Sequence, residues 1–271
     1  MSSFDSSEDR LTDKSDWDWR YGSQAAQDTP ARSRLPEKYF GSYSEIRFWS
    51  LLGKHVAPQP GESVLEIGCA PGRVLKSFAT RFGCIPHGVE FSKPGFDLTC
   101  ENFQRWGYPA ENVIHADLFD STFQASVAGK FDIVISGGFI EHFTDCRSVI
   151  AAHLAPLRPG GALIVTIPNY RGLNYWLGQR TLPDLLPLHN FDIMNIAGFR
   201  DLFPPAQVET RWSGYFGGFD FGMFDTGAPG RLPVIGRGIQ TMLNFGFRMV
   251  PPPELSSTSP YLLFTGRKIS G

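Results

Sequence analysis

A short loop between an apolar run and a helix-like segment holds the most informative chemistry of this chain. The apolar run ends at Ile67, just after Glu66, and a turn of small residues follows, with Gly68 and Gly72 at its ends. Glycines at these places let the backbone bend sharply and approach a ligand that a side chain would block. The helix after the turn directs free N–H groups towards the same place. Because Glu66 adds a negative charge there, the loop predicts a nucleotide-type site for a cationic ligand.

The spacing of the glycines sets this loop apart from a dinucleotide-binding loop. The dinucleotide fingerprint requires glycine at the first, third and sixth positions. Counting from Gly68, Ala70 and Arg73 stand at the third and sixth positions, so two of the three glycines are missing. A dinucleotide is therefore disfavoured. The turn residues Cys69 and Ala70 are expected to contact a different nucleotide-type ligand.

Two further strand ends carry residues that suit such a ligand. In open α/β sheets, ligands bind outside the carboxyl ends of the strands. Glu90 ends the second predicted strand, about 20 residues beyond the loop, where an acid can accept hydrogen bonds from both ribose hydroxyls. Phe91 follows it directly. Asp117 and Leu118 follow the third strand and can bind the amine and the ring of a base. Each acid alone could be an ordinary solvated residue, but their register with the loop favours the ligand.

The fourth strand leads into Gly137 and then into the adjacent pair Glu141 and His142. An unperturbed histidine pKa of about 6.5 suits the removal of a proton from a bound molecule. His142 is therefore a candidate general base, with Glu141 beside it. A histidine near the start of a helix can equally cap the helix or pack against it. His189 presents a similar choice between lining an acceptor pocket and capping a helix.

Regular alternation of strands and helices would place all these residues at one edge of a sheet. The expected strands of this part are 63–67, 85–89, 113–116, 131–136 and 162–167. The expected helices between them are about 73–82, 94–106 and 144–154. Short β-rich runs that alternate with helices are typical of a doubly wound parallel α/β sheet. A helix at about 193–203 and two strands, 208–212 and 261–267, complete a Rossmann-like sheet of seven strands.

Composition limits the classes of protein to which the chain can belong. With 271 residues it can form one large domain, and its net charge of −2 argues against binding nucleic acid through phosphates. The four cysteines show no metal-binding spacing, which favours a reducing, cytoplasmic setting. No secretory signal and no membrane-spanning run is apparent. The sequence leaves open whether the protein is a monomer or a homodimer.

Aromatic residues outside the expected strands are candidates for a substrate pocket. Residues 1–33 are acidic and polar, and we expect a flexible tail before a single domain at 34–271. The cofactor half of that domain would span about 60–168. Substrate-pocket and lid elements would come from 34–56, 169–203 and 213–253. The candidate pocket residues are Trp17, Trp19, Tyr21, Tyr43, Tyr170 and His189.

The segment 213–253 is too long for a turn between two strands and looks like an insertion. Within it, residues 231–249 carry three arginines, no acid and many apolar side chains. Such a basic amphipathic segment can be a lid, a dimer contact or a peripheral membrane helix, or it can pack in the core. We favour a lid or a pocket wall. Gly236, Gly238 and Gly246 weaken the expectation of a helix.

Five segments together resemble, in order and spacing, the class I S-adenosylmethionine-dependent methyltransferases: VLEIGCAPG, GVEFS, ADLFD, FDIVISGGFIEHF and LRPGGALIVTIPN. The resemblance covers roughly residues 63–169 and is strongest to the branch that methylates small molecules. It implies that S-adenosylmethionine is the cofactor and that its methionine part lies in the glycine loop. Glu90 would bind the ribose, and Asp117 and Leu118 would hold the adenine. The implied cofactor-binding residues are Glu66, Gly68, Cys69, Ala70, Gly72, Glu90, Phe91, Asp117, Leu118 and Gly137.

The resemblance implies methyl transfer to an oxygen or nitrogen atom of a small, partly apolar acceptor. No N/D-P-P-Y motif follows the fourth strand and no Pro-Cys pair occurs, which disfavours methylation of nucleic-acid bases. No metal cluster is apparent, so no metal is expected. Two alternatives remain open: a non-catalytic protein that binds the cofactor for a regulatory or scaffold role, and another enzyme on the same fold.

Overall fold

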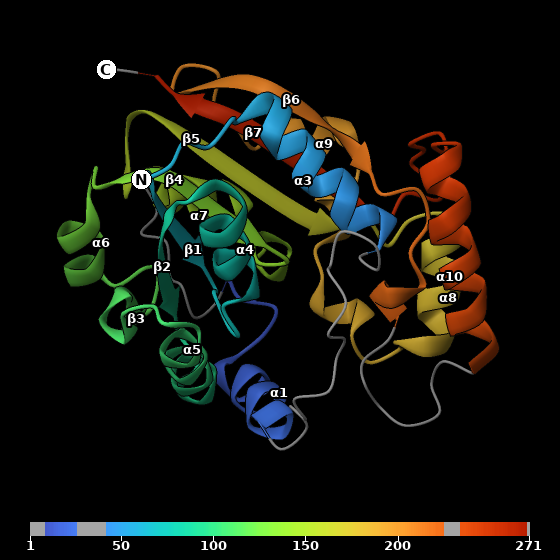
Figure 1. Cartoon of the computed structure of the whole chain (residues 1–271), viewed down its shortest axis with the longest axis horizontal. Helices are drawn as coiled ribbons and strands as arrows, with labels where there is room; N and C mark the ends of the chain where they lie inside the picture. The colour runs from blue at the N-terminus through green and yellow to red at the C-terminus, as the bar shows by residue number, and fades with distance from the viewer. Residues whose placement is uncertain (1–8, 26–41, 225–233, 270–271) are drawn as a thin grey trace.

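One seven-stranded sheet forms the centre of the molecule (Figure 1). The computed structural model describes residues 9–25, 42–224 and 234–269. The strands are β1 (Ser63–Ile67), β2 (Ile85–Glu90), β3 (Val113–His115), β4 (Phe131–Gly137), β5 (Leu157–Pro168), β6 (Val208–Phe216) and β7 (Tyr261–Lys268). Their order is β3-β2-β1-β4-β5-β7-β6. β1 to β5 pair in parallel and β7 runs antiparallel to both neighbours, which confirms the predicted fold class.

Helices cover both faces of this sheet. The α-helices are α1 (Lys14–Ala25), α3 (Tyr43–His55), α4 (Arg73–Phe82), α5 (Lys93–Trp106), α6 (Ser121–Val127), α7 (Cys146–Leu154), α8 (Leu173–Thr181), α9 (Ile196–Arg200) and α10 (Val234–Met249). Short 3-10 turns lie at Ala110–Asn112, Ile140–His142, Leu186–Leu188, Phe191–Ile193 and Phe221–Phe224. Buried side chains of α3, α4 and α5 form one apolar cluster with the sheet, and those of α6 and α7 belong to the cluster on the other face.

The alternation of side chains along β5 shows why helices must pack on both faces of the sheet. Successive residues of a strand point to opposite faces. Leu163 and Val165 belong to the cluster with α7, whereas Ala162 and Ile164 belong to the cluster with α3 and α4. All four are almost completely buried. An apolar run without polar alternation is typical of a strand covered on both faces, which is the arrangement that the sequence predicts.

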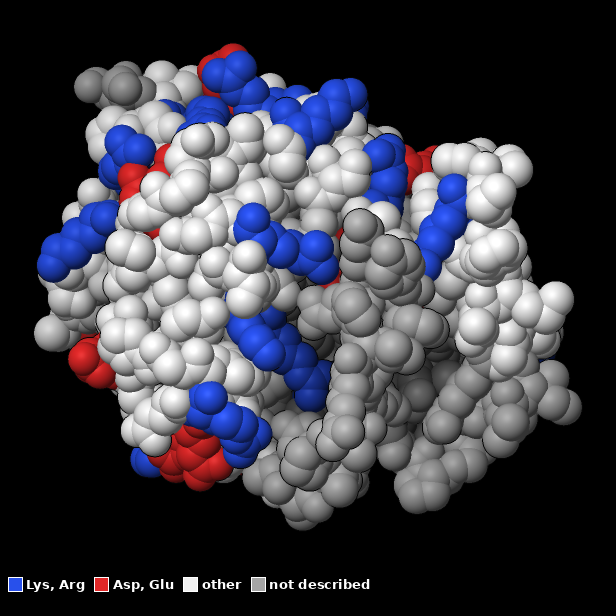
Figure 2. Space-filling model, viewed as in Figure 1, with Lys and Arg blue, Asp and Glu red and all other residues white. Residues whose placement is uncertain are grey.

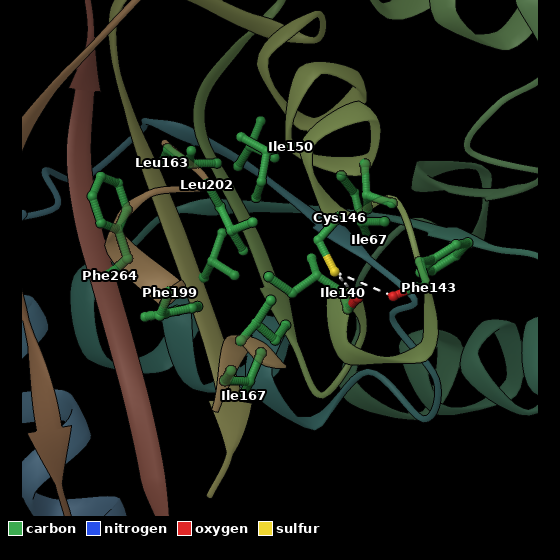
Figure 3. Close-up of a cluster of buried hydrophobic side chains, with 14 of the residues drawn as sticks. Ile67, Ile140, Phe143, Cys146, Ile150, Leu163, Ile167, Phe199, Leu202 and Phe264 are labelled. Carbon is green, nitrogen blue, oxygen red and sulfur yellow. Dashed lines mark hydrogen bonds between the residues drawn. The ribbon is translucent and has the colours of Figure 1, made fainter. Parts of the chain in front are cut away.

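Figure 3 shows part of the cluster on the α7 face. Side chains from β1, β5, α7 and β7 converge there, among them Ile67, Ile150 and Phe264. The thiol of Cys146, at the start of α7, donates to the carbonyl oxygens of Ile140 and Phe143 at 3.2 Å each. These contacts fix the turn after β4 against the core.

Side-chain caps set the starts of the helices next to the sheet. The hydroxyl of Ser92 accepts from the N–H of Gly95 at 3.3 Å at the start of α5, where a proline occupies the first turn. Asp145 caps α7 in the same way through the N–H of Ser148 at 3.2 Å. Ser, Asp and Asn are preferred at this position because their oxygens satisfy N–H groups that have no partner within the helix.

The structure departs from the expected elements both inside and outside the cofactor half. Inside it, β5 begins at Leu157 rather than at residue 162. Residues 9–25 belong to the expected flexible tail, but α1 is a helix that packs against α5. The remainder of residues 1–33 lies outside the described residues. The helices α6 and α8 were not predicted, and the helix expected at 193–203 is limited to the five residues of α9.

The expected insertion contains both a longer strand and a helix. β6 continues to Phe216, and α10 forms in spite of its glycines. On α10, the side chains of Met242, Phe245 and Met249 are exposed, and mostly uncharged atoms cover this helix in Figure 2. Of the helices in the described part of the chain, none has the length and hydropathy needed to cross a bilayer.

Candidate active site

A cavity of about 240 Å³ lies at the carboxyl ends of β1, β2 and β4. Residues from the loop after β1, the end of β2 and the loops after β3 and β4 line it, together with residues of the N-terminal segment. Eight of the predicted cofactor-binding residues are part of this lining: Glu66, Gly68, Ala70, Glu90, Phe91, Asp117, Leu118 and Gly137. The structure therefore brings together the strand ends that the sequence singled out.

The glycine loop has the backbone conformation that its sequence requires. Gly68 has a φ of 69° and Gly72 a φ of 86°, in the left-handed region that favours glycine. A Cβ on Gly68 would lie 2.9 Å from the ring of Phe139, so a larger residue would require that ring to move. Gly72 stands at the N-cap of α4 rather than in the cavity wall. Cys69 is buried and lies beside Gly88 of β2, so it supports the loop from behind.

Glu90 holds the loop in place through three backbone N–H groups. One carboxylate oxygen accepts from Phe91 at 3.0 Å and Ser92 at 2.9 Å, and the other accepts from Ala70 at 3.1 Å. Burial raises the pKa of Glu90, although the three N–H donors act in the opposite direction. The residue is thus anchored to the loop after β1 while it lines the cavity.

Glu66 lines the same cavity, but one of its carboxyl oxygens lacks the hydrogen-bond partners that Glu90 has. Its side chain is buried, and among the described residues its Oε2 has no hydrogen-bond partner. Burial, and then the nearby charge of Glu90, raise the pKa of Glu66 well above its ordinary value. A buried acceptor without a partner is unfavourable. A cationic group of a ligand in the cavity would relieve that cost.

Asp117 is ion-paired, which differs from the expected free acceptor. The guanidinium of Arg10 donates to both of its carboxylate oxygens at 2.7 and 2.6 Å. The N–H of Phe119 donates to Oδ1 at 3.0 Å. Arg10 also lies over the ring of Phe91, with 4.4 Å between its Cζ atom and the ring centre. Arg10 is 107 residues from its partner, and no local sequence pattern joins the two, so the sequence alone does not reveal its role.

The aromatic residues of α1 divide into two that line the cavity and one that does not. Trp17 and Tyr21 line it, and the Tyr21 hydroxyl donates to the carbonyl of Ala70 at 3.3 Å. Trp17 donates through Nε1 to Thr12 at 3.1 Å. Trp19 is 76% exposed and points to solvent. α1 therefore covers the cavity with one face only.

His142 lies in the cavity wall with an edge-on contact to Trp17, at 5.1 Å between ring centres. Its Nδ1 is 2.8 Å from the carbonyl oxygen of Leu188, and because a carbonyl only accepts, Nδ1 carries the proton and Nε2 the lone pair. Burial, and then the charge of His189, lower the pKa of His142 to about 3. His142 is therefore neutral near pH 7, and it is a weaker base than its unperturbed pKa implies.

The comparisons with known proteins agree with this geometry. A family model described as a methyltransferase domain matches residues 38–212, which is more than half of the chain. The chain belongs to the class I S-adenosylmethionine-dependent methyltransferases. This membership confirms the resemblance carried by the five sequence segments.

Individual relatives are more distant. The chain is 27% identical over 139 residues to a ubiquinone biosynthesis O-methyltransferase of Thiobacillus denitrificans, a match that covers 50% of this chain and 58% of that protein. It is 31% identical over 115 residues to a nocamycin O-methyltransferase of Saccharothrix syringae, covering 42% and 40%. The chain thus spans about half the length of the curated relatives it matches.

Solved structures share the fold of this methyltransferase at low sequence identity. One is geranyl diphosphate C-methyltransferase from Streptomyces coelicolor A3(2), which was solved with Mg²⁺, geranyl diphosphate and S-adenosyl-L-homocysteine. The TM-score is 0.55 at 14% identity, and the match covers 81% of this chain and 79% of that chain. At this identity the likeness supports the shared architecture alone.

In this methyltransferase the remaining predicted residues lie behind the cavity or away from it. Glu141 is buried, and burial raises its pKa to about 8. The ring of His189 lies 4.7 Å from that of His142 and 5.1 Å from that of Tyr170, centre to centre. Tyr43 packs against Phe247 of α10 and belongs to another part of the molecule. Thus α10 contacts α3, and none of its described side chains lines this cavity.

The structure also brings together three residues that could bind a metal ion, although the sequence predicted no metal site. One potential ligand atom each from Glu141, His142 and His189 lies within 4.8 Å of the other two. The adjacent Glu-His pair was visible in the sequence. The third member was not assigned to the group because 47 positions separate His189 from His142, and only the tertiary fold brings it close.

Proposed function

We propose that this protein transfers the methyl group of S-adenosylmethionine to an oxygen or nitrogen atom of a small, partly apolar molecule. The observation that carries the proposal is the buried, unsatisfied carboxyl of Glu66 beside a glycine loop and the second acid, Glu90. Two acids that line one cavity favour a cationic nucleoside over a phosphate-bearing one. S-Adenosylmethionine carries both an ammonium and a sulfonium charge.

Each part of the cofactor has a matching group in the proposed arrangement. Glu66 would accept from the ammonium group, and Glu90 would accept from the ribose hydroxyls with the lone pairs that its backbone donors leave free. Leu118 and Phe91 provide apolar surface for the adenine ring. Asp117 is already paired with Arg10, so it would position that arginine and contribute less to binding the adenine amine.

The character of the acceptor follows from the other wall of the cavity. Trp17, Phe139, His142 and Phe143 give this wall aromatic surface that suits a partly apolar molecule. The two curated relatives named above are both O-methyltransferases, which favours an oxygen acceptor. Methyl transfer from a sulfonium is an in-line displacement, so holding the acceptor in line supplies much of the acceleration.

His142 is the candidate base in this proposal, acting through the lone pair on Nε2. A lowered pKa limits that role, because a weak base removes a proton less readily in the transition state. The proposal therefore assigns most of the rate to positioning. Removal of the acceptor proton would contribute where the acceptor is a hydroxyl.

Binding and turnover together test the proposal. Calorimetry with S-adenosylhomocysteine should give saturable binding, whereas NAD should give none. Transfer of a tritium-labelled methyl group to phenolic and aliphatic alcohols should then identify the acceptor class. Absence of cofactor binding at millimolar ligand would overturn the proposal. Binding without turnover of any acceptor would favour the alternative of a non-catalytic protein that binds the cofactor.

A further inference from the structure

Three side chains of metal-binding type meet behind the wall of the cofactor cavity. Glu141 and His142 belong to the turn after β4, and His189 follows the turn Leu186–Leu188. One potential ligand atom of each lies within 4.8 Å of the other two. Tetrahedral ligands at about 2.0–2.1 Å from an ion are roughly 3.3 Å apart, so small side-chain rotations would close this group around an ion.

Hydrogen bonds hold both histidines in the form that binds metals. Nδ1 of His142 donates to the carbonyl of Leu188 at 2.8 Å, and Nδ1 of His189 donates to the carbonyl of Leu185 at 2.7 Å. Each ring therefore keeps its lone pair on Nε2. Metal-binding histidines in proteins typically donate their second ring N–H to a carbonyl or a carboxylate in this way.

Glu141 is the second, independent indication of a ligand. Its side chain is only 1% exposed, and among the described residues its Oε2 has no hydrogen-bond partner. Its Oε1 lies 3.9 Å from Nε2 of His142. The backbone carbonyl of Glu141 accepts from the N–H of Asn190 at 2.7 Å, which fixes the turn after β4 against the segment that carries His189. A buried carboxyl without a partner is costly unless something binds it.

We infer that Glu141, His142 and His189 bind a divalent transition-metal ion of the zinc class. Two imidazole nitrogens and one carboxylate oxygen suit Zn²⁺, whereas Mg²⁺ prefers oxygen ligands. Three protein ligands leave a fourth coordination position open. His142 is the member of the group that lines the cavity, so in this inference the open position is directed past its ring towards the bound molecules.

The open position has a chemical use, and this part of the inference rests on the proposed function. With its Nε2 lone pair bound to the ion, His142 would no longer act as the base. A hydroxyl oxygen of the acceptor that binds the ion would instead release its proton to solvent more readily. The oxygen would then form a bond to the methyl carbon while the bond from that carbon to sulfur breaks. The products are the methylated acceptor, S-adenosylhomocysteine and one proton.

Metal titration of the chelator-treated chain tests the site without reference to activity. Calorimetry with Zn²⁺ should show one ion bound per chain. Co²⁺ bound in its place should give visible absorption bands typical of a low coordination number. His189→Gln and Glu141→Gln should each weaken Zn²⁺ binding at least ~10-fold. His55→Gln, a change at a histidine on α3 outside the group, is the control and should bind Zn²⁺ as the wild type does.

S-Adenosylhomocysteine binding, measured on the same samples, separates the two proposals. A protein that binds S-adenosylhomocysteine but takes up no Zn²⁺ would overturn the metal site and leave the proposed function standing. The reverse result would overturn the proposed function and support the metal site. Zn²⁺ binding that survives both substitutions in correctly folded variants would show that the ion lies elsewhere, and it would overturn the assignment to these residues.

Discussion

Glu66 and Glu90 share one cavity but have opposite surroundings, and this difference determines what each can do. Three backbone N–H groups stabilise the carboxylate of Glu90, whereas Glu66 keeps an oxygen without a partner. Glu90 therefore holds the glycine loop in the conformation described. In the proposed function, a cationic group of the ligand would be the partner of the Glu66 oxygen.

Glu90→Ala should weaken S-adenosylhomocysteine binding strongly. In the proposed arrangement the change removes two charge-assisted hydrogen bonds to the ribose, each worth roughly 1.5–3 kcal/mol. Calorimetry measures the loss. Glu111→Gln, a substitution of an exposed acid near the start of β3, is the control and should leave the dissociation constant unchanged. Equal affinities for Glu90→Ala and the wild type would remove Glu90 from the cofactor site.

The affinity for S-adenosylhomocysteine should rise with pH in the wild type and less so in Glu66→Gln. Burial, and then the charge of Glu90, hold the pKa of Glu66 well above its ordinary value in the free protein. A cationic ligand group favours the ionised carboxylate, so binding releases a proton. The affinity therefore increases up to that raised pKa and then levels off. Parallel pH profiles for the two proteins would contradict this assignment, since titration of the ligand itself affects both equally.

At the level of single residues, the sequence predicted the groups that local patterns reveal. Gly68 and Gly72 have positive φ angles, and the acids lie at or just after the ends of predicted strands, so local patterns in the sequence reveal them. Arg10 could not be found in this way, because only the tertiary fold brings it to Asp117. The low pKa of His142 likewise depends on burial and on His189, neither of which its neighbours in the sequence reveal.

Among the elements, α1 offers the clearest test, because one helix carries both a cavity residue and a matched control. Trp17→Ala should weaken S-adenosylhomocysteine binding several-fold by removing part of the cavity wall and its contact with His142. Trp19→Ala should have no effect, because this side chain is 76% exposed. Calorimetry and tryptophan fluorescence measure both variants. Similar losses for the two would mean that α1 acts through its helical stability alone.

Most elements of the cofactor half were predictable to within a residue or two, but β5 begins at Leu157 rather than at residue 162, and α6 was not predicted. β1 and α4 have the expected bounds because apolar runs and flanking glycines mark them clearly. α6 is short, and its burial depends mainly on Phe123 and Val127, which is too little periodicity to recognise. α8 lies in an aromatic-rich stretch with a weak helical pattern. Tertiary packing, rather than local helix propensity, makes these segments helical.

For the whole molecule, stability should depend on the stack between β7 and the segment after α9. The rings of Phe203 and Phe264 lie 3.5 Å apart, centre to centre, and Phe264 is fully buried. Phe264→Ala should lower the free energy of unfolding by about 3–5 kcal/mol. Phe245→Ala, on the exposed side of α10, should change it by less than ~0.5 kcal/mol. Urea denaturation compares the two, and equal midpoints would contradict the packing described.

The position of β7 between β5 and β6 has a consequence for how the chain reaches this structure. β5 and β7 pair across a long stretch of sequence, and such distant pairing forms slowly. Until β7 arrives, β5 is an edge strand with a run of apolar residues and unpaired N–H and C=O groups, which is a template for association with another chain. We therefore expect refolding from denaturant to compete with aggregation, and the yield of native protein to fall as the chain concentration increases.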